Sequence, residues 1–168
     1  ADVAPAHVVR WHNFLEGNEP EDWYDMYPGG DVDQVRADLR TILTAALGDN
    51  FEETDTSFKL TRKDVDMWVQ PFRGIAYIHV YAGGMPGDAK EEQLVNAEEC
   101  LRRNWNDPLG RLSLDEDRDM VWEVQVPMQY LTADYLTEAL DEGRRQVNDY
   151  WNKYGHVPFN ETSDDEES

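Results

Sequence analysis

The sequence predicts one α+β domain in which helices pack on a largely antiparallel sheet. The stretch from Val65 to Gly84 alternates between aliphatic and other side chains with the period of two that is typical of β-strands. Three other stretches repeat apolar residues at helical spacing. The strands are short and joined by tight turns, so neighbouring strands should run antiparallel. The expected order is helix, three strands, helix, two strands, helix.

The chain of 168 residues is long enough for one hydrophobic core with additions at both ends. We expect an N-terminal arm with a helical part and a hinge over residues 1–30, the α+β domain over 31–159, and a disordered acidic tail over 160–168. The arm is rich in aromatic residues and bounded by Pro and Gly. Its contacts, with its own domain or with a neighbouring subunit, should involve Trp11, Trp23 and Tyr24.

The first helix of the domain should begin at Asp31 or Asp33 and end at Gly48. Residues 51–55 are expected to form a connector, followed by a strand over 57–61. Asp88 is predicted to cap the second helix, which runs to about Asn104. A second hairpin should follow over 109–114 and 120–126, with Leu112, Leu114, Met120, Trp122, Val124 and Val126 facing inward. Thr132 should cap the third helix, which Gly155 ends.

The hairpin over residues 65–84 has two unlike faces, with its turn expected at residues 71–74. One face is aliphatic. The other carries Trp68, Tyr77, His79 and Tyr81, where a strand facing water usually carries Thr, Lys or Glu. We therefore expect a helix or a binding partner to cover the aromatic face.

The net charge of -21 narrows the classes of partner. Such a field repels phosphate groups, so neither direct nucleic-acid binding nor membrane-surface binding is expected. It attracts basic proteins and cations, although the same composition also suits solubility or a salty environment. Cys100 is the single cysteine, and no signal-peptide pattern opens the chain, so the expected location is the cytoplasm.

No motif for catalysis or for a cofactor is present, and we expect neither enzymatic activity nor a metal site. The segment Asp115–Asp119 resembles the start of a calcium-binding loop, but Met120 and Val126 stand where that loop needs Gly and Glu. The four histidines lack metal-binding spacing. Phosphate-binding loops and nucleophile elbows are also absent from the sequence.

Several short motifs between Asp31 and Tyr154 resemble the YbjN family, and the element order resembles that of type III secretion chaperones. The motifs are VQPFRG at 69–74, Asn96, LGRLSLD at 109–115, VQVP at 124–127 and LTADYL at 131–136. The resemblance implies a non-catalytic protein-binding module, chaperone- or adaptor-like, because secretion chaperones are small acidic homodimers that hold an extended client. YbjN proteins are linked to stress response and regulation.

These observations lead to a prediction of function and of partners. The client should be a basic protein, such as a single-stranded-DNA-binding, repair or stress-response protein, held at Trp68, Tyr77, His79 and Tyr81. A homodimer should form through Leu94, Val95, Leu101 and Trp105 of the second helix, whose apolar face exceeds what one sheet needs. The second hairpin is the alternative contact. The alternative is a sensor of a cation or small ligand that uses His79 and the acidic segment 115–119.

Overall fold

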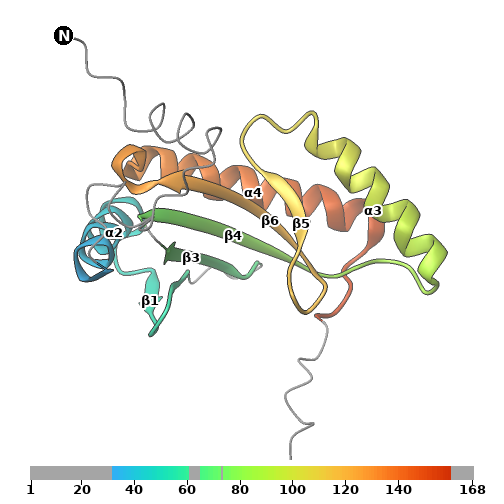
Figure 1. Cartoon of the computed structure of the whole chain (residues 1–168), viewed down its shortest axis with the longest axis horizontal. Coiled ribbons are helices and arrows are strands. Elements are labelled where there is room, and N and C mark those ends of the chain that lie inside the picture. Colours follow the sequence, from blue (N-terminus) through green and yellow to red (C-terminus); the bar gives the residue numbers. More distant parts are fainter. Residues whose placement is uncertain (1–31, 61–64, 73, 160–168) are drawn as a thin grey trace, which may run out of the picture.

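The computed structural model describes residues 32–60, 65–72 and 74–159. The predicted arm, with Trp11, Trp23 and Tyr24, and the predicted tail lie outside the described residues. The elements in chain order are α2 (Val32–Leu47), β1 (Phe51–Glu53), β2 (Phe58–Leu60), β3 (Met67–Phe72), β4 (Ile75–Gly84), α3 (Lys90–Asn104), β5 (Arg111–Leu114), β6 (Asp119–Pro127), the 3-10 turn η1 (Met128–Tyr130) and α4 (Ala133–Tyr154) (Figure 1). This is the predicted α+β order with one additional strand.

All strand pairs are antiparallel, and the sheet has the order β1-β2-β3-β4-β6-β5. The long strands β4 and β6 form its centre and pair from Ile75↔Pro127 to Gly84↔Asp119. Their register shifts between Tyr81 and Gly83. Helix α3 connects β4 to β5 in the chain. In the sheet, however, the neighbour of β4 is β6, and β5 is an edge strand.

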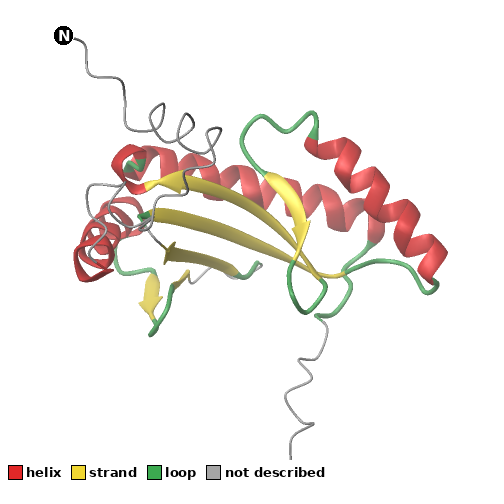
Figure 2. Cartoon of the chain, viewed as in Figure 1, coloured by secondary structure: helices red, strands yellow, loops and turns green. Residues whose placement is uncertain are grey.

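The core lies between one face of the sheet and helices α2 and α4 (Figure 2). Alternate residues of β3 and β4, among them Met67, Val69, Ile78 and Val80, are fully buried on this face. Helix α4 contributes residues at helical spacing: Leu136, Ala139, Leu140, Gly143, Val147 and Tyr150. Two short-range predictions are confirmed here. The hydroxyl oxygen of Thr132 accepts the Tyr135 N–H at 3.1 Å, and Gly155 follows the last residue of α4 with φ of 80°.

The indole of Trp122 is fully buried where β6 passes under α4. Its Nε1–H donates to Asp107 Oδ2 at 2.9 Å. Two glycines make room for the ring. A Cβ atom on Gly110 would lie 2.2 Å from Trp122 Cζ2, and a Cβ atom on Gly143 would lie 2.5 Å from Trp122 Cε3. The ring therefore sets how closely α4 and the segment before β5 approach the sheet.

Four local predictions need correction. Residues 51–53 form strand β1 rather than a connector, because they pair with β2 across a short turn. The turn of the first hairpin is shorter than predicted, since β3 continues to Phe72 and β4 begins at Ile75. The N-cap of α3 is Ala89 rather than Asp88, and the side chain of Ala89 makes no capping hydrogen bond. Leu114 is 44% exposed, because β5 ends at this residue, at the edge of the sheet.

Substitution of Gly143 by Ala tests the role of Trp122. Helix propensity alone would make this change stabilising by about 1 kcal/mol. The new methyl group would also lie 2.6 Å from Val80 Cγ2, so we expect overpacking to dominate and the free energy of unfolding to fall by about 1–3 kcal/mol. Urea denaturation gives the value. Asn152→Ala, at an exposed position of the same helix, should change it little, and a stabilised Gly143→Ala variant would contradict this account.

Candidate functional site

The predicted aromatic residues lie together on the face of the sheet opposite to the core. Five rings follow one another along this face and contact edge-on or tilted, with centroids 6.3, 6.2, 6.2 and 6.1 Å apart: Phe72, Tyr77, His79, Tyr81 and Phe159. We call these five residues the aromatic row. Residues 77, 79 and 81 share a face because side chains alternate along β4. The side chains of the three are half-buried, which leaves part of each ring accessible.

Trp68 extends this surface onto β3, where it pairs with His79 across the strands. The ammonium group of Lys59, its partner on β2, lies 5.3 Å from the centroid of the Trp68 ring. This distance is in the range of cation–π attraction. The face of the Trp68 ring thus already accepts a cationic side chain of its own chain.

A polar cluster interrupts the aromatic surface at the middle of the row. His79, Glu123 and Arg111 are cross-strand partners on β4, β6 and β5. His79 Nε2 lies 3.5 Å from Glu123 Oε2, and Arg111 Nε donates to Glu123 Oε1 at 2.8 Å. The hydrogen bond from His79, followed by that from Arg111, outweighs burial and lowers the pKa of Glu123 to about 2. Glu123 therefore stays ionised at neutral pH and holds both partners in place.

Carboxylates gather near the Tyr81 end of the row. Burial raises the pKa of Tyr81, and the charges of Asp115, Asp119, Asp117 and Glu123 raise it further. The segment 115–119 is itself an ordinary β-turn region, in which the Asp119 N–H donates to Asp115 Oδ1 at 2.8 Å and Arg118 has a positive φ of 66°. Within the described ranges, no group of three or more His, Cys, Asp or Glu side chains could hold a metal ion.

The segment after α4 brings Phe159 to the aromatic row. Val157 bridges to Gly83 in parallel orientation, and the Gly84 N–H donates to the Val157 carbonyl at 3.2 Å. Only glycine fits at residue 83, because φ is 93° and a Cβ would lie 2.1 Å from the Val157 oxygen. No local sequence pattern predicts that residue 159 returns to Tyr81.

The edges of the sheet are poorly suited to the addition of another strand. On β5, the Asn104 amide bonds both the Leu112 carbonyl (2.9 Å) and the Leu112 N–H (2.7 Å). Asp107 Oδ1 accepts the Gly110 N–H at 3.0 Å. On the other side, the edge strand β1 has only 3 residues, and the part of β3 that β2 leaves uncovered beyond Val69 includes Pro71, which has no N–H to offer. The aromatic face is thus a better binding surface than either edge.

Helix α3 leaves its predicted apolar residues exposed in the single chain. Leu94, Val95 and Leu101 are 62%, 64% and 68% exposed, and Trp105 is 91% exposed. We call these four residues the α3 face. Cys100 is the only buried residue of this helix, and burial raises the pKa of its thiol. Polar contacts also join α3 to α4: Tyr154 Oη donates to Glu99 Oε2 at 2.6 Å, and Arg103 Nη2 to Gln146 Oε1 at 2.8 Å.

Comparison with known proteins identifies the family. A family model, YbjN, described as "Putative bacterial sensory transduction regulator", matches residues 36–154. The chain belongs to this family, as the motifs predicted. No match is found among curated proteins.

Two solved structures of type III secretion chaperones share the fold. The Yersinia pestis chaperone SycH, in complex with a stable fragment of YscM2, is 17% identical, with a TM-score of 0.53 over 68% of this chain and 98% of the other. The chaperone of the HopA1-SchA chaperone-effector complex is 13% identical, with a TM-score of 0.51 over 74% and 98%. The prediction of a chaperone-like α+β fold is confirmed. No helix among the described residues is long and apolar enough to cross a membrane.

The pH dependence of stability tests the polar cluster. The pKa of Glu123 falls from 4.5 to about 2 on folding. The part of the free energy of unfolding that comes from ionised Glu123 is therefore complete above pH 4.5 and is lost as the pH falls toward 2. We expect Glu123→Gln to be less stable at neutral pH and to lose less stability than wild type across this interval. Thermal melts at stepped pH measure both effects. Glu116→Gln in the nearby turn is the control, and parallel pH profiles for wild type and Glu123→Gln would contradict the assignment.

Proposed function

We propose that this protein is a non-catalytic, chaperone- or adaptor-like module that holds a basic, partly extended protein segment on its aromatic row and Trp68. The observation that carries the proposal is the row itself. A line of half-buried rings on the sheet face opposite to α2 and α4 offers affinity that charge alone does not supply. The family match and the chaperone neighbours support a protein-binding role.

The charge of the chain supports a cationic client. A net charge of -21 speeds the encounter with a basic partner, and the carboxylates beside Tyr81 continue this field to the end of the row. The Lys59–Trp68 contact shows the kind of interaction that a client lysine or arginine would make. A single-stranded-DNA-binding or repair protein, or a stress-response protein, is the class of client that fits this chemistry.

Site-specific crosslinking in cells tests the proposal and identifies the client in the same experiment. A photoreactive phenylalanine analogue at Tyr77 should capture a basic protein, which mass spectrometry identifies. The same analogue at Asn152, an exposed position of α4 on the other side of the sheet, should not capture it. Equal capture at both positions, or an acidic or nucleic-acid partner at Tyr77, would refute the proposal.

Kinetics with the captured client separate the two components of binding. Trp68→Ala should raise the dissociation rate about tenfold or more, because a central aromatic contact is lost. Added salt should mainly slow association, because it screens long-range attraction. The melting temperature of the same variant is the control. A destabilised variant with an unchanged dissociation rate would remove Trp68 from the binding surface.

We also propose that the protein is a homodimer that buries the α3 face. An exposed apolar patch with a 91% exposed tryptophan at its end is unusual for a monomer and typical of an interface. Light scattering at micromolar concentration should give twice the chain mass of 19.5 kDa. Leu94→Asp should shift the mass toward that of a single chain, whereas Glu91→Gln, a polar change on the same helix, should not. A monomeric wild type would disprove the dimer.

A further inference from the structure

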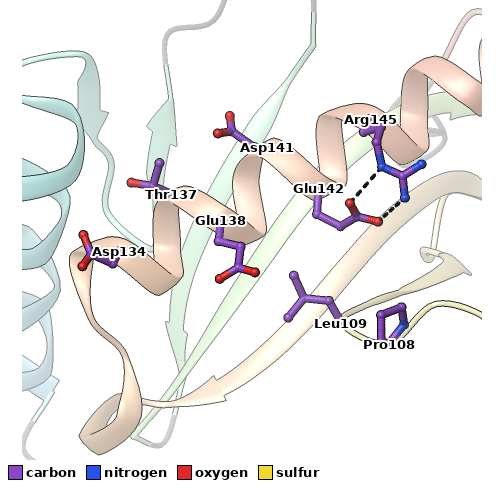
Figure 3. Close-up of a pocket in the computed structure, with 8 residues that line it drawn as sticks. All are labelled: Pro108, Leu109, Asp134, Thr137, Glu138, Asp141, Glu142 and Arg145. Carbon is purple, nitrogen blue, oxygen red and sulfur yellow. Dashed lines mark hydrogen bonds and ion pairs between the residues drawn. The ribbon is translucent and has the colours of Figure 1, made fainter.

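A groove runs between the exposed side of α4 and the loop that leads into β5 (Figure 3). It encloses about 880 Å³ and has an apolar floor formed by Pro108 and Leu109. Its rim on α4 carries Thr137, one cation, Arg145, and four carboxylates: Asp134, Glu138, Asp141 and Glu142. The groove belongs to the helical layer, whereas the aromatic row lies on the opposite face of the sheet. It is therefore separate from the surface proposed above.

The stability of α4 does not explain Glu138, the residue at the centre of this acidic rim. Asp134, Glu138 and Glu142 follow one another at a spacing of four residues, and like charges at this spacing destabilise a helix by about 0.2–0.5 kcal/mol per pair. Asp134 in the first turn is favoured by the helix dipole. Glu142 is held by Arg145, whose nitrogens lie 2.5 and 2.9 Å from its oxygens. Neither reason applies to Glu138, which is exposed in the middle of the helix.

Charge complementarity selects the occupant of the groove. Residues 1–30 contain six acidic side chains and one arginine, and residues 160–168 contain five acidic side chains and no basic one. Neither segment suits an acidic rim, and a second copy of the chain would bring another net charge of -21. The groove instead suits a segment that presents cationic groups to the rim and an aliphatic side chain to Leu109.

We propose that this groove is a second docking surface, which binds a basic amphipathic segment of a protein partner. Asp134 and Glu138 lie four residues apart and are separated by about 6 Å along the helix axis, whereas Glu142 is already paired with Arg145. Lysine or arginine side chains at a spacing of four residues on a partner helix would match this rise. Leu109 receives the aliphatic residue between them, as in other complexes in which an amphipathic helix lies in a groove.

The test uses the full-length chain and a synthetic 18-residue helical peptide with lysines four residues apart and leucines beside them. Fluorescence anisotropy at 0.15 M salt gives the Kd. Glu138→Lys should weaken binding about tenfold, because it places a like charge at the centre of the rim. Asp55→Lys is the matched control, because it makes the same charge change at an exposed residue of the β1–β2 turn. It should change the Kd less than twofold.

Two further measurements complete the test. A peptide with serine in place of leucine should bind about tenfold more weakly, and Trp68→Ala should leave the affinity of the original peptide unchanged. Circular dichroism melts check that Glu138→Lys is folded, and Glu138→Gln, with a smaller expected loss of affinity, provides a second measurement if it is not. Equal weakening by Glu138→Lys and Asp55→Lys would show attraction by net charge alone and overturn the proposal. Competition by spermidine as effective as that by the leucine peptide would overturn it as well.

Discussion

The hydrogen bond between the buried indole of Trp122 and Asp107 connects the centre of the sheet to the segment between α3 and β5. Asp107 Oδ2 accepts the indole N–H, while Oδ1 accepts the N–H groups of Leu109 and Gly110, both at 3.0 Å. Burial alone would raise the pKa of Asp107, but these donors outweigh it and lower the pKa. The carboxylate thus remains charged and fixes the segment between α3 and β5 against the core.

Three surfaces depend on the position of that segment. It brings Asn104 to the backbone of Leu112, which closes the β5 edge of the sheet. It carries Pro108 and Leu109, which form the floor of the groove beside α4. It also sets the end of α3, whose one buried residue, Cys100, offers little apolar contact with the rest of the chain. A loop held by one carboxylate therefore determines which parts of the molecule remain available to partners.

The relation to the secretion chaperones is one of fold rather than of sequence. At identities of 17% and 13%, the likeness is one of architecture, a sheet covered by helices. The surfaces proposed for binding are the row of rings along β4, the exposed α3 face and the acidic rim of α4. The proposed binding surfaces therefore rest on residues of this chain, and the neighbours share only its architecture.

Local sequence determined much of the fold and the centre of the candidate site. Alternation along residues 75–84 places Tyr77, His79 and Tyr81 on one face whatever the rest of the chain does, because successive side chains of a strand point in opposite directions. The periodicity of residues 133–154 likewise assigns the buried side of α4. The same patterns predicted the element order, which agrees with the structure apart from strand β1, and the motifs between residues 69 and 136 indicated the family.

Tertiary structure decided the features that join distant segments. Strand β1 has three residues, too few for a periodic signal, and exists because β2 pairs with it. The return of Phe159 to Tyr81 depends on the passage of residue 157 over Gly83, which no pattern within either segment encodes. The groove arises because Leu109 comes to lie beside residues 134–142 of α4. Periodicity indicates which side of an element is buried, whereas the packing of the whole chain determines which elements meet there.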